Sequence, residues 1–312
     1  MAPDNGMSVR VAGIGTALPE KVVTNDDLAQ HMDTSDAWIR ERSGIGERRV
    51  GGSTVDMAVE AATAAIAAAD LTPDDIGFLV LCTTTPEKTF PASSAMVAAS
   101  LGITCGAMDL NVVCAGFPYG YVAAYGMMTT PGGPDRVLVI GSDAMSTIVD
   151  WTDRGTAILF GDGAGAVVLE KSPQGELLGQ DFGVNGDLES ILYCDLGDTI
   201  VMEGREVFKR AVRAVTGSVE NALAQAGISA EDIDVVLPHQ ANIRIIEAVT
   251  QRLGIPMEKT FNVLEHTGNT SGASIPMAMA AADEAGVLEP GAVVLMSGFG
   301  AGMAWGSVVV TW

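Results

Sequence analysis

Short, continuous apolar runs alternate with longer Ala-rich or amphipathic stretches along the whole chain. Each run is bordered by Gly, Pro, Asp or a charged residue. Apolar strands between helical patterns are typical of sheets covered by helices on both faces. The pattern predicts a layered α/β protein in which two sheets pack helices between and outside them. The runs are FLVLC (78–82), RVLVIG (136–141), AGAVVLE (164–170), DVVLPH (234–239) and AVVLM (292–296).

The two halves of the chain carry similar segments in the same order, about 157 residues apart. We therefore expect two duplicated halves, 1–170 and 171–312. No Ser/Gly-rich or charged linker separates them, so they should form one rigid body whose equivalent strand ends meet at the centre. The matching pairs are LTPDDIGFLVLC (71–82) with ISAEDIDVVLPH (228–239), the Ala-containing helical stretches that start at 57 and 214, PDRVLVIG (134–141) with PGAVVLMS (290–297), and GFP (116–118) with SIP (274–276).

Cys114 is the candidate nucleophile. It follows a strand-like run and precedes a helical pattern with Pro118 in its first turn, so the thiol should lie at or near a helix N-terminus. Backbone N–H groups at such a position favour a thiolate. The local pattern is equally compatible with a buried structural cysteine, and this is our interpretation of Cys82, Cys105 and Cys194.

His239 and Asn269 are expected at the same seam. His239 directly follows an apolar run, and sites in α/β proteins lie at the carboxyl ends of strands. Asn269 lies in HTGNTSGASIP (266–276), just before the helix equivalent to the one after Cys114. A lone histidine is more often structural, and an Asn in such a run is ordinarily a turn or N-cap residue. Both side chains can also donate hydrogen bonds into the central space.

Composition excludes several classes of protein. With 17 Lys+Arg against 39 Asp+Glu, the net charge of −22 leaves no general basic footprint for nucleic acid or for an anionic membrane. Four scattered cysteines form neither a disulfide scaffold nor a zinc site. The N-terminal MAPDNGMSVR lacks a signal-peptide pattern, so we expect a cytoplasmic protein.

Two glycine-rich regions have alternative readings that we disfavour. GDGAGAVVL (161–169) and GFGAG (298–302) lack the GxGxxG spacing of a dinucleotide loop, which argues against a nicotinamide oxidoreductase. The apolar stretch 292–310 is interrupted by glycines, so it predicts two strands and a turn rather than a membrane span.

Six motifs together resemble β-ketoacyl-acyl-carrier-protein synthase III, a family of the thiolase-like superfamily. They are DTSDAWIRERSGI, NVVCAGFPYG, DRGTAILFGDGAGAVVL, HQANIRI, GNTSGASIP and FGAGMAWGS. The resemblance implies a five-layered αβαβα fold and a homodimer. It also implies a decarboxylating Claisen condensation of a short acyl-CoA primer with malonyl-acyl-carrier-protein, which initiates fatty-acid synthesis. We expect no metal and no cofactor, since acyl-CoA is a substrate.

The resemblance also implies roles for individual residues. Cys114 would carry the acyl group, and His239 and Asn269 would stabilise the enolate left by loss of CO₂. The oxyanion hole for acyl transfer would use the backbone N–H groups of Cys114 and Ala301. Further matches are Thr34, Trp38 (stacking on adenine), Arg42, Arg154, Gly204, Phe208, Asn242 and Ile245 for CoA, Phe90 for the acyl pocket across the dimer, and Lys209, Arg244 and Arg252 for docking of acyl carrier protein.

Two departures from the family and several alternatives stay open. The segment before GREVFK is about ten residues shorter than usual, and Ala301 replaces the middle glycine of a GGG motif, where its N–H can serve only if its φ is negative.

The main alternative is a polyketide starter-unit loading enzyme or acyltransferase. A catalytically silent partner subunit is disfavoured by Cys114. The primer acyl chain is not determined by the sequence.

Overall fold

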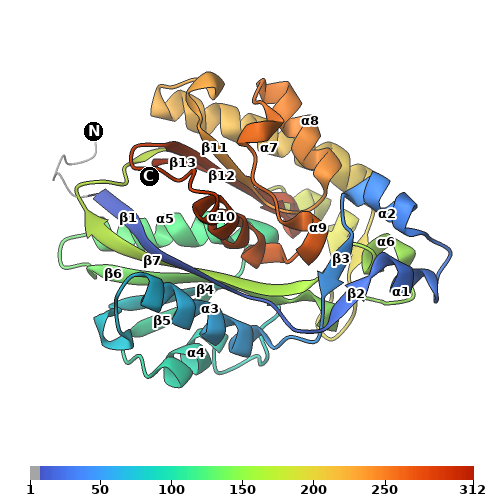
Figure 1. The fold of residues 1–312 in the computed structure, drawn as a ribbon, viewed down its shortest axis with the longest axis horizontal. Coiled ribbons are helices and arrows are strands. Elements are labelled where there is room, and N and C mark those ends of the chain that lie inside the picture. Colours follow the sequence, from blue (N-terminus) through green and yellow to red (C-terminus); the bar gives the residue numbers. More distant parts are fainter. Residues whose placement is uncertain (1–7) are drawn as a thin grey trace.

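Two mixed β-sheets form the frame of residues 8–312, the part of the chain that this computed structural model describes (Figure 1). Residues 1–7, on which the leader prediction partly depends, lie outside that part. The first sheet has the order β1 (Ser8–Ala17), β7 (Asp162–Ser172), β6 (Arg136–Ala144), β4 (Phe78–Cys82) and β5 (Gly106–Leu110). The second has the order β11 (Val235–Pro238), β12 (Val293–Gly300), β13 (Ala304–Thr311) and β8 (Leu177–Gly183).

The two sheets share one internal plan. In the first, β4 is parallel to β6, while β6–β7 and β7–β1 are antiparallel. In the second, β11 is parallel to β12, while β12–β13 and β13–β8 are antiparallel. Strand β5 extends only the first sheet. The sequence repeat therefore corresponds to two sheets of like order, and the stretch 292–310 forms the two predicted strands. The boundary between 170 and 171 stays a prediction.

Helices complete five alternating layers, which confirms the predicted fold class. Helices α5 and α10 lie between the sheets, α3 and α4 cover the outer face of the first sheet, and α7 and α8 cover the outer face of the second (Figure 1). Their bounds are α3 Thr54–Ala68, α4 Ser93–Leu101, α5 Gly116–Thr129, α7 Gly204–Ala226, α8 Ile243–Leu253 and α10 Ser274–Glu284.

Smaller elements lie at one end of the layers (Figure 1). Strands β2 and β3 pair with each other, as do β9 and β10. The bounds are β2 Val22–Thr24, β3 Glu47–Arg49, β9 Leu192–Tyr193, β10 Val201–Met202, α1 Asn25–Ala29, α2 Asp36–Ser43, α6 Arg154–Ala157 and α9 Leu264–Thr267. Within residues 8–312, no helix has the length and apolar character needed to cross a membrane.

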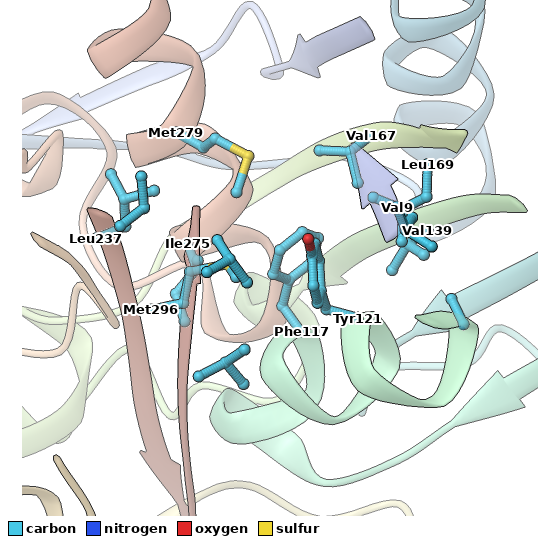
Figure 2. Close-up of a cluster of buried hydrophobic side chains, with 14 of the residues drawn as sticks. Val9, Phe117, Tyr121, Val139, Val167, Leu169, Leu237, Ile275, Met279 and Met296 are labelled. Carbon is cyan, nitrogen blue, oxygen red and sulfur yellow. The ribbon is translucent and has the colours of Figure 1, made fainter. Parts of the chain in front are cut away.

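The central core is built from α5, α10 and the inner faces of both sheets. Phe117 and Tyr121 of α5 lie beside Ile275 of α10 (Figure 2), and all three side chains are at most 2% exposed. Burial of each large apolar side chain contributes about 1.5–3 kcal/mol. Because Phe117 and Ile275 occupy equivalent places in the repeat, each half supplies one side of the same core. This shared packing holds the two halves together at the site.

Candidate active site

A cavity of about 1110 Å³ opens beside the seam between the two halves. Cys114, His239 and Asn269, which come from three separate segments, all line it. The other predicted residues that line it are Trp38, Arg42, Gly204, Phe208, Lys209, Asn242, Arg244, Ile245 and Ala301. Thr34, Phe90, Arg154 and Arg252 do not line it.

Cys114 lies in a 3₁₀ turn, Val113–Ala115, that leads directly into α5. This is the helix-N-terminal position expected from the sequence. Val113 has a φ of +50°, an unusual conformation for a β-branched residue. The turn is therefore held by its surroundings, and that strain is concentrated beside the candidate nucleophile.

The Cys114 thiol does not have the low pKa expected of a helix N-terminus. Its side chain is only 7% exposed, and this burial raises the pKa of Cys114 to about 12. A hydrogen bond with the Ser271 hydroxyl lowers that pKa, while the charge of Asp143 raises it further. In this state the residue is a neutral thiol, because desolvation of the thiolate outweighs the favourable backbone position.

Glycines let β12 and β6 approach the turns that begin the central helices. A Cβ atom on Gly300 would lie 2.8 Å from the Cys114 nitrogen, and one on Gly298 would lie 3.1 Å from the Cys114 carbonyl oxygen. In the first half, a Cβ atom on Gly141 would overlap the carbonyl oxygen of Gly272. The central strand of each sheet therefore supports the helix-starting turn contributed by the other half.

His239 directly follows β11 and is held at both its backbone and its ring. Its backbone N–H donates to Ser297 (2.7 Å), and its Nδ1 lies 2.7 Å from the Ser274 hydroxyl oxygen. The side chain is 4% exposed, and burial lowers the pKa of His239 to about 3. The imidazole is therefore neutral at physiological pH, with one ring nitrogen engaged by Ser274.

Asn269 is oriented by its own local segment. Its Oδ1 accepts the Ser271 backbone N–H at 2.9 Å. Its backbone N–H donates to the Leu159 carbonyl at 2.8 Å, and its carbonyl accepts the Gly161 N–H at 3.0 Å. Because the amide oxygen is occupied within the chain, the Nδ2 end is the one left to donate into the cavity.

The φ angle of Ala301 is not positive, which is the condition for its N–H to serve as a donor. The positive φ angles in its 3₁₀ turn fall on Gly302 (+69°) and Met303 (+47°), and Ala301 is not among the positive-φ residues. An alanine is thus accommodated where a glycine is usual. Its N–H remains a candidate donor beside Cys114.

Trp38 lies in the cavity wall, and two guanidinium groups lie over its ring. The Arg42 guanidinium is 4.6 Å and that of Arg154 is 4.8 Å from the ring centroid. Arg154 also donates to the Asp33 carbonyl at 2.7 Å. These three side chains therefore form one cluster, although Arg154 does not line the cavity, and their role at a nucleotide site stays a prediction.

Positive side chains gather on the cavity wall contributed by α2, α7 and α8. Arg42, Lys209 and Arg244 line the cavity and are exposed. So is Arg205, which the sequence analysis missed, although it lies in the same GREVFK motif as Gly204. Lys209 is paired with Glu206 at 2.8 Å. Two acidic residues, Glu189 and Asp195, also line the cavity, so the wall is mixed in charge.

Besides Arg154, three predicted residues do not line the cavity. Thr34 is half-buried, with a hydroxyl oxygen that has no hydrogen-bond partner among the described residues. Arg252 is exposed in the last turn of α8. Phe90 is 83% exposed, which is unusual for so large an apolar side chain.

Asp143 is a fully buried carboxyl that the sequence analysis did not single out. Its Oδ1 accepts hydrogen bonds from the Thr83 and Thr85 hydroxyls and from the Thr84 and Thr85 N–H groups, at 2.8–3.2 Å. Its Oδ2 accepts the Gly272 N–H at 2.9 Å, which crosses from the first half to the second. The sequence around it, GSDA (141–144), contains no motif that would have identified it.

Two family models match separate parts of the chain. Residues 108–186 match the family model of 3-oxoacyl-[acyl-carrier-protein] synthase III, and residues 223–312 match the model of its C-terminal part. The β-ketoacyl-[acyl-carrier-protein] synthase III 1 of Bacillus anthracis is 45% identical over 98% of this chain and 99% of its own.

Solved structures agree in fold. The 3-oxoacyl-[acyl-carrier-protein] synthase III of Aquifex aeolicus superimposes with a TM-score of 0.95 at 40% identity, covering 97% of this chain and 100% of its own. The priming β-ketosynthase of the R1128 polyketide pathway superimposes with a TM-score of 0.91 at 32% identity, covering 97% and 96%.

A duplicated αβαβα frame with a cysteine, a histidine and an asparagine around one central cavity defines a thiolase-like condensing enzyme. This chain belongs to the β-ketoacyl-acyl-carrier-protein synthase III family.

Proposed function

We propose that the chain condenses a short acyl-CoA primer with malonyl-acyl-carrier-protein, giving 3-ketoacyl-acyl-carrier-protein and CO₂ and so initiating fatty-acid synthesis. The observation that carries this proposal is the convergence of Cys114, His239 and Asn269 on one cavity. A thiol can take up and release an acyl group, and two neutral donors can stabilise an enolate without removing a proton from carbon.

In the first half-reaction, Cys114 Sγ attacks the thioester carbon of acyl-CoA. The bond from that carbon to the CoA sulfur breaks, and the proton of the Cys114 thiol ends on CoA. The N–H groups of Cys114 and Ala301 stabilise the tetrahedral oxyanion. The close approach of Gly300 to the Cys114 nitrogen supports this pairing, because it brings the two backbone segments together.

In the second half-reaction, loss of CO₂ from the malonyl group leaves an enolate that attacks the acyl carbon on Cys114. His239 Nε2–H and Asn269 Nδ2–H hold the thioester oxygen as its charge grows. This role needs the proton of the neutral imidazole to be on Nε2, which is the tautomer in which Nδ1 accepts a hydrogen bond from the Ser274 hydroxyl. It also needs the Nδ2 group of Asn269 to be free. The hydrogen bond from the Ser271 N–H occupies Oδ1 and leaves Nδ2 available.

The remaining contacts follow the path of the substrates. Trp38, Arg42 and Arg154 hold the nucleotide of CoA, with Thr34 nearby. Gly204, Phe208, Asn242 and Ile245 line the pantetheine channel, and all four border the cavity. Lys209, Arg244 and Arg252 receive the acidic carrier protein, a local exception to the net charge of −22.

The protein acts as a homodimer in this proposal. Among residues 8–312, β5 pairs only with β4 and so leaves one edge of the first sheet open for pairing. Phe90 is 83% exposed in the single chain, as expected of a side chain that completes the acyl pocket of a partner.

The test separates the two half-reactions. Radiolabelled acetyl-CoA, isobutyryl-CoA or octanoyl-CoA should label Cys114, and Cys114→Ala should abolish the label. Asn269→Ala should keep the label but slow CO₂ release from malonyl-carrier-protein by on the order of 10²–10³. Labelling without any 3-ketoacyl product would leave an acyltransferase, and loss of labelling in Asn269→Ala would mean that the assigned roles are wrong.

A polyketide role is the second candidate, favoured by the similarity to the R1128 priming β-ketosynthase. The two functions use the same chemistry and differ in carrier protein. Faster product formation with a polyketide carrier protein than with a fatty-acid carrier protein, at equal concentration, would favour the second candidate.

A further inference from the structure

The His239 ring is held by a buried hydroxyl on α10. Ser274, the first residue of that helix, is fully buried, and its Oγ lies 2.7 Å from His239 Nδ1. The His239 backbone N–H donates to the Ser297 carbonyl at 2.7 Å, and the Phe299 ring packs edge-on to the imidazole with 5.7 Å between the ring centroids. Within residues 8–312, Nε2 has no hydrogen-bond partner. It is therefore the ring nitrogen that remains available to a substrate.

The direction of this hydrogen bond follows from what else each group can reach. A serine hydroxyl has one proton to donate, and a neutral imidazole has one protonated and one unprotonated nitrogen. In the described part of the chain, Ser274 Oγ has no hydrogen-bond partner other than His239 Nδ1. If Nδ1 carried the proton, the hydroxyl proton would have no acceptor in a fully buried site, which is costly. The hydroxyl therefore donates to Nδ1, and the imidazole proton lies on Nε2.

The first half has the same contact without the hydrogen bond. In the repeat, His239 corresponds to Cys82 and Ser274 corresponds to Gly116. A Cβ atom on Gly116 would lie 3.3 Å from the Cys82 Cβ, so in both halves the residue at the strand end faces the start of the central helix. Gly116 has no side chain, whereas Ser274 supplies a hydroxyl. The polar pair thus belongs to the half that supplies both proposed donors to the enolate.

We propose that Ser274 is a positioning residue that selects the Nε2–H tautomer of His239 for decarboxylation, an assignment that rests on the condensation proposed above. When CO₂ leaves, negative charge grows on the malonyl thioester oxygen, and the Nε2–H group stabilises it. In the other tautomer, Nε2 would present a lone pair to that oxygen and repel it. Ser274 itself exchanges no proton. Acyl transfer to Cys114 uses backbone N–H groups in the proposed function and does not depend on Ser274.

The tautomer is measured directly by NMR of the full chain labelled with ¹⁵N-histidine. The chain has three histidines, so the His239 signals are identified as those lost in His239→Asn. Correlations between the ring nitrogens and the carbon-bound ring protons distinguish the two tautomers. We expect a single set of His239 signals with the proton on Nε2. A proton on Nδ1 in the wild type would overturn the proposal, whether or not the protein is active.

Ser274→Ala removes the hydroxyl and keeps a residue that favours a helix. It should slow CO₂ release from malonyl-acyl-carrier-protein about tenfold, the effect expected from one neutral hydrogen bond. Acylation of Cys114 should be unchanged, followed by intact-protein mass with whichever of acetyl-, isobutyryl- or octanoyl-CoA acylates the wild type. The His239 signals should show both tautomers, because Nδ1 no longer has a donor. A merely structural defect would not move the tautomer while sparing acylation.

Ser142→Ala is the matched control. Ser142 is also fully buried, and its hydroxyl donates one hydrogen bond, to the Thr54 carbonyl at 2.8 Å, but none to His239. This variant should leave both rates and the His239 signals unchanged. Equal slowing of acylation and CO₂ release in Ser274→Ala, or equal slowing of CO₂ release in the two serine variants, would overturn the proposal. A wild type that shows the Nε2–H tautomer but releases no CO₂ would instead overturn the proposed function.

Discussion

The turn that begins α5 and the turn that begins α10 share a backbone but differ in their side chains. Val113 and Ser271 occupy equivalent places, with φ angles of +50° and +51°, and each starts a 3₁₀ turn that leads into a central helix. The first turn carries a thiol and the second carries a hydroxyl that meets it. Duplication thus supplied a symmetric frame, and substitution at a few positions made the two turns complementary.

The largest expected effect comes from the glycines that support these turns. Gly141→Ala should cost at least about 3 kcal/mol of unfolding free energy, because its Cβ would overlap the backbone of Gly272. Gly298→Ala should cost about 1 kcal/mol, since its Cβ meets the Cys114 carbonyl at 3.1 Å. Denaturant unfolding of both variants measures the difference.

Gly126→Ala is the control for this pair, because a Cβ there meets nothing within 4 Å. It should be neutral or slightly stabilising, as expected of alanine in a helix. Equal losses of unfolding free energy in Gly141→Ala and Gly298→Ala would contradict the closer approach of β6 to its turn.

The second effect concerns the acid sensitivity that the buried His239 gives to the second half. The folded pKa of His239 is about 3 against 6.5 when free, so the unfolded chain binds the extra proton as pH falls below 6.5. This histidine's contribution is therefore fully present above pH 6.5 and is lost as pH falls toward 3. Between pH 7 and pH 5 we expect a loss of about 2 kcal/mol.

His239→Asn should flatten this pH dependence, measured as unfolding free energy at fixed salt. His266→Asn is the control, because that side chain is 70% exposed. The same pH slope in His239→Asn and wild type would contradict burial of a neutral imidazole.

The smallest effect concerns charge on the helices that follow β4 and β11. Helix α4 has no basic residue, whereas α8 carries Arg244 and Arg252. Arg244→Glu should lower kcat/KM for malonyl-carrier-protein about fivefold at low salt while sparing acylation from CoA. Lys21→Glu, an equal charge change outside this surface, should have no effect, and an equal loss in both variants would argue against a docking role for Arg244.

The sequence predicted what depends on local pattern and order. The apolar runs became the strands, the repeat became two sheets of like order, and Cys114, His239 and Asn269 reached one cavity because equivalent strand ends meet. The prediction of a low pKa for the Cys114 thiol was wrong. A position at a helix N-terminus can be predicted from the local sequence, whereas desolvation depends on every residue that packs around the sulfur.

Asp143 and Ser271 escaped the sequence analysis for a related reason. Neither residue type is unusual in its segment, and their contacts form only where the two halves meet: Asp143 accepts the Gly272 N–H, and the Ser271 hydroxyl meets the Cys114 thiol. Arg205 was missed although its motif was identified, because a helix sequence alone does not show which side faces a cavity.

The two guanidinium groups over the Trp38 ring bear on how tightly the proposed nucleotide site can hold CoA. An adenine that takes the place of Arg42 or Arg154 on the ring loses that contact, at a cost on the order of 0.5–1 kcal/mol. In the proposed site the adenine and the guanidinium groups therefore compete for one aromatic surface, and the competition lowers the affinity for CoA.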